Sequence, residues 1–373
     1  MRKQRNIPSW RAPIYRLAMM VGLVVLCCMP DLRHAAAMDQ FDMLHTPAIA
    51  VRAPSQAFLI GLTAAGARLV AVGEHGLIIY SDDDGVTWRQ ANVPVGVSIT
   101  TIAFATAQEG WAAGAFGVIL HTVDGGANWT VQTTGVQVNR LMTATAAQFS
   151  AADPTAESAQ TALRRAGIFA AAGPDKPFLS ILPLSSNDVF VFGAYRMCVK
   201  TMDGGKSWAD CSLDIGDAIS HNLYGAAKIG QSLYLAGEAG MVFRSDNPGG
   251  GFSRLPSPAA STFFGLLAGK ANRLLVYGVA GRIFYTDDNG KNWAPANIAT
   301  DSDVTAGVVL KSGSILVVTE SGNIFVSSDN GANFRMVGRN MGMALFGVVQ
   351  AADGDAVLIG ASGVRVLPSA PLT

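Results

Sequence analysis

Short apolar runs alternate with turn residues along most of this chain. Residues 58–62 form one such run, and a later run over 118–121 leads into a polar turn. Apolar runs this short, bounded by glycine, serine and aspartate, are typical of β-strands. A Gly-x-x-Gly tetrad ends the second strand of several repeats, at 73–76, 114–117, 237–240 and 278–281. The pattern therefore predicts many short strands that are joined by tight turns.

The polar turns follow one template, Ser/Thr-x-Asp-x-Gly-x-x-Trp/Phe, which we call the Asp box. It occurs six times, and the steps between its template positions are 41, 79, 44, 41 and 41 residues. The template positions are Asp83, Asp124, Asp203, Asn247, Asp288 and Asp329, and the closing aromatic residues are Trp88, Trp129, Trp208, Phe252, Trp293 and Phe334. A period near 41 is typical of the four-stranded blade of a β-propeller. The sequence therefore predicts an all-β fold, a β-propeller with Asp-box (BNR-like) repeats.

Seven blades account for the repeats within residues 38–373. We expect them near 57–90, 99–132, 177–212, 222–255, 262–295, 304–336 and 343–368. The seventh repeat has no Asp box and no fourth strand. Residues 49–52 precede the first blade and could supply that outer strand, which would close the ring and protect an exposed sheet edge.

The Asp-box residues are best explained by a structural role. Asp and Ser/Thr side chains hydrogen-bond the backbone of a tight turn, glycine adopts the positive φ, and the aromatic residue packs on its blade. A calcium loop is the rival interpretation of residues 82–84, but Tyr80 stands at the first ligand position that the EF-hand spacing requires. Residues 205–207 look like the end of a phosphate loop, but the glycine that the motif needs five residues before Lys206 is missing.

One step between boxes is longer than the others because of an Ala-rich insert at about 135–176. The insert lacks the alternation of a strand. Asp153 suits a helix N-cap, Pro154 the first helical position and Gly167 the residue after the last turn. We therefore expect a helix from Pro154 to about residue 166 and a weaker one near 141–149. The insert is either a tolerated surface insertion or a lid or docking element.

The direction of the strands separates two faces of the ring. Strands alternate within a blade, so all the Asp boxes should lie on one face, and the Gly-x-x-Gly turns, the links between blades and the insert should lie on the other. We call this second surface the candidate binding face. Its candidate residues are Glu74, His75, Phe116, Tyr195, Arg196, Glu238, Arg282 and Glu320.

Residues 1–37 have the pattern of a secretory signal peptide. A basic start is followed by an apolar run over 17–29, and the alanines at 35–37 suit cleavage before Met38. An uncleaved membrane anchor is the alternative, although the run is short for a spanning helix, which needs about 20 apolar residues. We therefore expect a periplasmic or secreted protein.

The charge of the chain argues against a nucleic-acid partner. The chain has 27 basic and 27 acidic residues, and residues 1–37 hold six of the basic and one of the acidic ones. Residues 38–373 therefore keep 21 basic and 26 acidic residues. Nucleic-acid binding draws on a basic surface instead.

Two cysteines remain after residue 37, and they flank the third Asp box. The hairpin register that sets Thr201 opposite Trp208 also sets Cys198 opposite Cys211. Directly opposed Cβ atoms lie about 4.5–5.5 Å apart, close to what a disulfide needs. We expect this disulfide in a compartment where disulfides form; two half-buried free thiols are the alternative.

The predicted central channel lacks the machinery of an Asp-box enzyme. Resemblance to a sialidase would imply three arginines, a tyrosine nucleophile and acidic partners, and a glycosidase needs two carboxylates about 5–9.5 Å apart. The inner strands instead hold neutral side chains such as Thr100 and Tyr224, and Glu74, Glu238 and Glu320 belong to separate blades. We therefore predict no catalytic, cofactor-binding or metal-binding residue. A carbohydrate-active enzyme of the sialidase or glycosidase type is the alternative function.

Residues 109–129 carry the most specific resemblance to known proteins. They read Gly-Trp, two residues, Gly-x-x-Gly, an apolar pair and then Thr-x-Asp-Gly-Gly-x-x-Trp. This segment resembles a repeat of the photosystem II stability/assembly factor family, and the pattern recurs with decay over about 57–368. The resemblance implies a seven-bladed, non-enzymatic propeller that binds membrane-protein partners during assembly, on the lumenal or periplasmic side. We therefore expect a monomer whose partner is a membrane protein or a membrane-protein complex.

Overall fold

The computed structural model describes residues 43–216, 221–247 and 250–372. Within this part of the chain most regular structure is β-strand, and both α-helices belong to the insert. Residues 44–373 form one compact unit. The predicted signal peptide lies outside the described residues.

The described strands make seven small sheets. The first four are β1 (Leu59–Ala65), β2 (Arg68–Gly73), β3 (Ile78–Ser81) and β4 (Arg89–Gln90); β5 (Ile99–Phe104), β6 (Gly110–Gly114), β7 (Ile119–Thr122) and β8 (Thr130–Thr133); β9 (Phe178–Pro183), β10 (Val189–Gly193), β11 (Cys198–Thr201) and β12 (Ala209–Asp210); and β13 (Leu223–Ile229), β14 (Ser232–Gly237), β15 (Val242–Ser245) and β16 (Ser253–Arg254).

The last three sheets vary in size. They are β17 (Phe263–Ala268), β18 (Leu274–Gly278), β19 (Ile283–Thr286) and β20 (Ala294–Pro295); β22 (Val304–Val309), β23 (Ile315–Thr319), β24 (Ile324–Ser327) and β25 (Asn333–Gly338), joined by the short β21 (Asn297–Ile298); and β26 (Leu345–Gln350), β27 (Ala356–Gly360) and β28 (Gly363–Leu367). Neighbouring strands pair antiparallel, except that β21 pairs parallel with β25.

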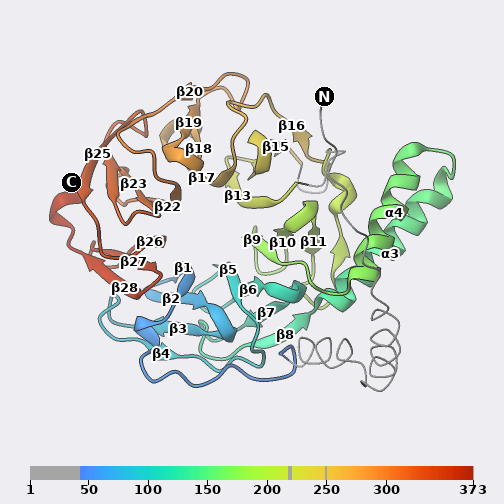
Figure 1. Cartoon of the computed structure of the whole chain (residues 1–373), viewed down its shortest axis with the longest axis horizontal. Helices are drawn as coiled ribbons and strands as arrows, with labels where there is room; N and C mark the ends of the chain where they lie inside the picture. The colour runs from blue at the N-terminus through green and yellow to red at the C-terminus, as the bar shows by residue number, and fades with distance from the viewer. Residues whose placement is uncertain (1–42, 217–220, 248–249, 373) are drawn as a thin grey trace, which may run out of the picture. The chain divides into compact units, whose positions relative to one another are not determined.

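The innermost strands close the ring. β1, β5, β9, β13, β17, β22 and β26 contact one another in that order, and β26 contacts β1 (Figure 1). Threonine hydroxyls tie neighbouring inner strands together: Thr100 donates to the Phe178 carbonyl at 2.5 Å, and Thr305 donates to the Leu345 carbonyl at 2.6 Å. The fold is therefore a β-propeller, which confirms the predicted fold class.

The hydrophobic cores lie between neighbouring sheets. The second strand of a sheet, such as β10, is buried along its whole length. Phe192 of β10 packs in one cluster with Leu235 and Phe243 of the next sheet. Burial on both faces explains why these strands are continuous apolar runs instead of alternating ones.

Each Asp box closes the turn between the third and fourth strands of its sheet. In the first box the Asp83 carboxylate accepts the Ser81 hydroxyl at 2.8 Å and the backbone N–H and hydroxyl of Thr87 at 2.8 and 2.5 Å. The Ser81 oxygen accepts the N–H of Gly85 at 2.9 Å, and Gly85 has a φ of 89°. The same Ser/Thr–Asp bond is present at Asp124, Asp203, Asp288 and Asp329.

The fourth box shows what the degenerate sequence changes. The Ser245 hydroxyl donates to the backbone carbonyl of Asn247 at 2.7 Å instead of to a carboxylate. The closing residue of this box, Phe252, still packs in the hydrophobic core of its sheet. In the first and second boxes, the Trp88 and Trp129 indoles also donate to glycine carbonyls within their own boxes, both at 2.9 Å.

Cys198 and Cys211 form a disulfide between β11 and the residue after β12. Their Cα atoms lie 4.9 Å apart, and the Cys211 N–H donates to the Cys198 carbonyl at 2.9 Å. Both residues are buried. The register Val199↔Asp210 is the one in which the two cysteines face each other.

The prediction that residues 49–52 complete the seventh blade is wrong. The last sheet has three described strands, and residues 49–52 lie along the first sheet instead. The Gln90 amide explains this, because it accepts the Val51 N–H at 2.8 Å and donates to the Ile49 carbonyl at 2.9 Å. The segment η1 (Pro54–Gln56) contacts β28, and a Cβ at Gly363 would lie 2.0 Å from the Ser55 carbonyl oxygen.

The insert is more helical than predicted. It consists of α3 (Gly135–Ala152) and α4 (Glu157–Ala172). The Thr134 N–H and the Gln137 side chain form a capping box at the start of α3, at 2.7 Å. Asp153 does not cap α4, because its carboxylate accepts the Thr155 N–H in the turn between the helices. Gly167 lies inside α4, which ends before Gly173.

Candidate functional site

The turns of the candidate binding face share one backbone conformation. They are η2 (Glu74–Gly76), η3 (Ala115–Gly117), η4 (Ala194–Arg196), η6 (Glu238–Gly240) and η8 (Val279–Gly281). In each turn the middle residue is left-handed, with φ between 52° and 56°. A Cβ at Gly76 would lie 2.0 Å from the Val95 carbonyl oxygen, so the last glycine of this turn is needed for the close passage of the link. The middle position tolerates different side chains, including His75, Phe116 and Tyr195.

The eight candidate residues come from six different sheets. Glu74, His75, Tyr195, Arg282 and Glu320 are exposed, and Phe116, Arg196 and Glu238 are half-buried. The structure thus spreads these residues around the ring. One of them, Tyr195, lies in a pocket that the insert forms.

Glu238 accepts hydrogen bonds from Asn222 and Tyr224 of the fourth sheet, and Asn222 links this group to the third sheet. Its carboxylate accepts the backbone N–H and the side-chain amide of Asn222 at 2.9 and 3.0 Å, and the Tyr224 hydroxyl at 3.3 Å. Asn222 in turn accepts the Tyr195 N–H at 2.8 Å. Burial, reinforced by the Glu238 charge, raises the pKa of Tyr224. The described inner strands hold no arginine, so the three-arginine clamp that a sialidase would need is missing from them.

The insert is a docked module whose helices lie at the outer edge of the ring, beside the β9–β12 sheet (Figure 1). Val138, Met142 and Phe169 of the helices share a hydrophobic core with Phe178 and Val191 of that sheet. The insert therefore packs into the propeller core, and its role as a lid or docking element stays a prediction.

A cavity of about 450 Å³ lies between α4 and η4, and we call it the insert pocket. Its lining residues are Thr161, Arg164, Arg165, Ile168, Phe169, Lys176 and Tyr195. Sequence reasoning identified only Tyr195 among them. The other six belong to the insert, where the pairing of a cation with an aromatic ring depends on how the two helices dock.

The insert pocket combines aromatic rings with cations. The Phe169 and Tyr195 rings meet edge to face, with centroids 6.0 Å apart. The Arg165 guanidinium lies 5.3 Å from the Phe169 centroid and donates to the Tyr195 carbonyl at 2.7 Å. The Lys176 ammonium lies 5.5 Å from the Phe169 centroid and 5.7 Å from that of Tyr195, and it also pairs with the Asp175 carboxylate. These contacts hold the pocket walls in one arrangement.

A second cavity, of about 470 Å³, follows the edge of the first sheet. It lies between the N-terminal residues 47–50 and residues 90–94, with Trp129 at one side. The same hydrogen bonds that bring residues 49–52 to the first sheet form its wall.

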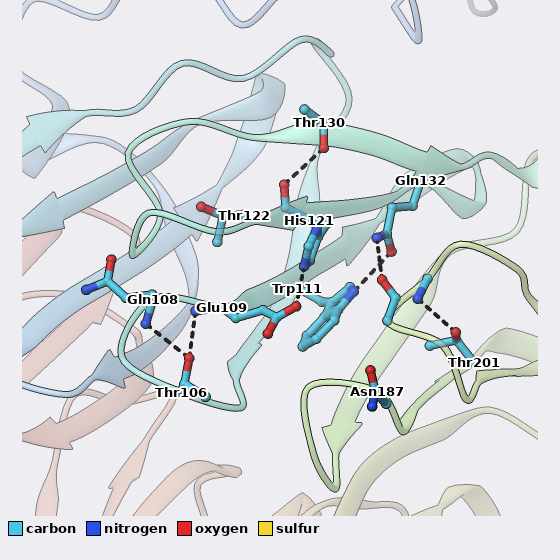
Figure 2. Close-up of polar contacts among 12 residues, drawn as sticks. Thr106, Gln108, Glu109, Trp111, His121, Thr122, Thr130, Gln132, Asn187 and Thr201 are labelled. Carbon is cyan, nitrogen blue, oxygen red and sulfur yellow. Dashed lines mark hydrogen bonds and ion pairs between the residues drawn. The ribbon is translucent and has the colours of Figure 1, made fainter.

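A histidine and a carboxylate meet on the second sheet, where Figure 2 shows His121 pointing toward Glu109. The His121 Nε2 and Glu109 Oε1 atoms lie 3.2 Å apart, and the His121 ring stacks on the buried Trp111 with centroids 4.8 Å apart. Trp111 donates to Gln132 at 3.0 Å, and Gln132 donates to the Gly204 carbonyl of the next Asp box at 2.9 Å. The hydrogen bonds of Trp111 and Gln132 therefore join the second and third sheets, and His121 packs on this structural contact.

The described part of the chain contains neither a cluster of metal-ligating side chains nor a helix that could span a membrane. Among the described residues, no three His, Cys, Asp or Glu side chains lie together as a metal site would require. No described helix combines the length and the apolar character of a membrane span.

The chain matches the family described as photosynthesis system II assembly factor YCF48 over residues 55–159 and 175–334. The chain belongs to this family. Residues 160–174, which make up most of α4, fall between the two matched ranges. The part of α4 that lines the insert pocket therefore lies outside the matched ranges.

Solved structures share the fold at low sequence identity. A structure titled "YCF48 bound to D1 peptide" is 14% identical, with a TM-score of 0.60 over 86% of this chain and 96% of that one. YCF48 from Cyanidioschyzon merolae is 13% identical, with a TM-score of 0.60 over 84% and 96%. A streptogramin B lyase structure is 14% identical, with a TM-score of 0.63 over 86% and 95%. No curated protein matches the chain. The likeness to a lyase is one of fold, whereas the family assignment is to an assembly factor.

Proposed function

We propose that this chain is an exported, non-enzymatic scaffold that binds a segment of a membrane protein or membrane-protein complex during its assembly. The family match over most of the propeller is the observation that carries this proposal. A similar YCF48 structure is bound to a D1 peptide, so a propeller of this kind can hold a peptide segment of a partner.

The insert makes the candidate binding face the preferred surface for the partner. Phe149, Leu163 and Ile168 are apolar side chains of the two helices, and they are 42%, 41% and 65% exposed. A partner segment that docks on the insert would cover these apolar side chains, and burial of apolar surface favours binding.

Export is the second part of the proposal. Residues 1–37 have the pattern of a signal peptide. The disulfide of Cys198 and Cys211 is consistent with an oxidising compartment such as the periplasm. Fractionation of cells that carry the full chain tests this, because a chain retained in the reducing compartment contradicts export.

Capture of the partner tests the scaffold role. The tagged full chain is crosslinked in cells and purified from solubilised membranes, and captured proteins are identified by mass spectrometry. We expect a membrane protein whose recovery falls in the triple variant Phe149→Ser, Leu163→Ser and Ile168→Ser. Deletion of the insert is a poor test, because Val138 and Phe169 belong to the propeller core.

A matched control comes from the Asp-box face. Val86, Val123 and Met202 are 77%, 68% and 76% exposed there, so Val86→Ser, Val123→Ser and Met202→Ser remove a comparable set of apolar side chains. We expect this variant to capture the partner as the wild type does. Equal loss in both variants, or no membrane protein in the wild-type sample, contradicts the proposed function.

A further inference from the structure

The insert pocket has an excess of positive charge. Arg164, Arg165 and Lys176 line it. The Asp175 carboxylate pairs with Lys176, and the half-buried Asp210 carboxylate interacts electrostatically with Arg165. Three cations therefore face two carboxylates, and Arg164 is the most exposed of these cations. The excess is local, since residues 38–373 as a whole have 26 acidic and 21 basic residues.

The apolar part of the pocket lies beside these cations. Phe169 is buried beneath the pocket, whereas Tyr195 and Ile168 are 48% and 65% exposed at its wall. An apolar side chain that entered the pocket would cover the Ile168 side chain and the Tyr195 ring, which are now in water. Burial of such surface is favourable in proportion to its area.

The cations are held in place for an incoming carboxylate. Arg165 is fixed by its bond to the Tyr195 carbonyl at 2.7 Å, and Arg164 donates to the Thr161 hydroxyl at 3.0 Å while remaining exposed. Guanidinium groups form strong, directional hydrogen bonds to carboxylates. Two neighbouring arginines whose geometry is set by the helix lose little freedom when they bind such a group.

We propose that the insert pocket binds an acidic peptide segment of the partner, with an apolar side chain against Ile168 and Tyr195 and an adjacent Asp or Glu carboxylate on Arg164 and Arg165. This inference rests on the proposed function, because the segment belongs to the membrane-protein partner. Arg164, Arg165 and Ile168 lie between the two ranges that the family pattern matches.

A peptide panel tests the pocket directly. The full chain is titrated into fluorescent, N-acetylated and C-amidated peptides in which leucine or phenylalanine is flanked by glutamates, and into a second panel in which lysines replace the glutamates. We expect the glutamate panel to bind, the lysine panel not to bind, and added salt to weaken binding. Failure of the whole glutamate panel overturns the proposal.

Paired variants locate the binding. Arg164→Glu and Ile168→Ser should each weaken binding of the glutamate panel by about tenfold or more, because they remove a charge-assisted contact and an apolar contact. The controls are Arg140→Glu and Val136→Ser, at exposed positions of the insert that do not line the pocket. Both should bind as the wild type does. Binding that both pocket variants retain places the peptide elsewhere and overturns the proposal.

Binding to phosphatidylglycerol vesicles tests whether the pocket binds an anionic membrane surface instead of a peptide. Vesicle binding that Arg164→Glu abolishes, with no peptide bound, would replace the peptide by a membrane surface and also overturn the proposal. The proposed function fails separately. If crosslinking captures a membrane protein but no glutamate peptide binds, the scaffold function is supported and the proposal for the insert pocket is overturned.

Discussion

At the residue scale, hydrogen bonds within the Asp boxes lower the pKa values of their carboxylates well below the ordinary value. Hydrogen bonds from the side chain and then the backbone of Thr87 lower the pKa of Asp83 to about 2. Ser207 does the same for Asp203, and Asn292 for Asp288, each with a pKa of about 2. The template residues could be predicted from the sequence because a box is local. The Gln132 bond to Gly204 could not, because it joins residues of two sheets.

The first prediction concerns acid stability. A carboxylate whose pKa is lowered from 3.8 to about 2 on folding stabilises the native state above pH 3.8, and this contribution is lost as pH falls toward 2. Urea unfolding of the wild type should therefore show a midpoint that declines between about pH 4 and pH 2. Asp83→Asn should have a lower midpoint than wild type at pH 7, and the difference should shrink at pH 2.

Asp301 offers the matched control for this experiment, since it is an exposed aspartate in the link before β22. Asp301→Asn should follow the wild-type profile. A constant difference between Asp83→Asn and the wild type from pH 7 to pH 2 would show that the carboxylate charge is not what stabilises the turn.

The second prediction concerns the disulfide. The bond closes a loop with a sequence separation of 13, so replacing Cys198 and Cys211 together by serine should lower the free energy of unfolding by about 2–3 kcal/mol. Chemical denaturation measures this. Intact mass after alkylation should increase only when a reductant is present, and alkylation of both thiols without reductant would contradict the disulfide in solution.

At the element scale, the insert shows where sequence reasoning succeeds and fails. Its helical character follows from its composition, but the helix boundaries were misplaced. Thr134 and Gln137 form a capping box that was readable in the sequence. The pair Asp153-Pro154 is compatible with the start of a helix and also with a turn. In the structure Asp153 closes a turn at the C-terminal end of α3. A cap and a turn use the same residue types, so only the packing of the helices distinguishes them.

The third prediction tests the corrected course of α4 with two glycines. Gly167 is inside the helix and has no neighbouring atom within 4 Å of its Cβ position, so Gly167→Ala should raise the free energy of unfolding by about 0.5–1 kcal/mol. Gly76 has a φ of 75° and the Val95 carbonyl oxygen 2.0 Å from its Cβ position. Gly76→Ala should therefore lower it by about 1 kcal/mol or more.

Thermal and urea unfolding of both variants gives the comparison. Each variant adds one methyl group, so the comparison sets an open helical position against a turn with a positive φ and no room for a Cβ. Destabilisation by Gly167→Ala would mean that α4 ends where the sequence first suggested, before residue 167.

At the scale of the whole molecule, the repeat period of the sequence predicts the ring of sheets. It does not predict which segment lies beside the last sheet. The period of about 41 residues identifies the propeller because each repeat makes one sheet. Which segment lies beside the last sheet depends on contacts between the two ends of the fold. Residues 49–52 have the length for an outer strand, yet the Gln90 amide holds them at the first sheet. The insert pocket could not be predicted from the sequence either, because Tyr195 and Phe169 come into contact only when the helices pack on the propeller.

The fourth prediction separates the scaffold from an enzyme. Tyr224 and Glu238 are hydrogen-bonded, but the described inner strands hold none of the three arginines that a sialidase would need to bind its substrate carboxylate. We expect no hydrolysis of sialosides or of a panel of glycosides by the full chain. Turnover that a Glu74→Gln or Glu320→Gln variant loses would support the carbohydrate-active alternative instead.

Site-specific photo-crosslinking in cells tests the central claim most directly. A photoreactive phenylalanine analogue replaces either Ile168 on the candidate binding face or Val123 on the Asp-box face, both of which are more than half exposed. We expect a crosslink from position 168 to one membrane protein and none to that protein from position 123. Equal crosslinking from both positions, or no membrane protein at position 168, would contradict it.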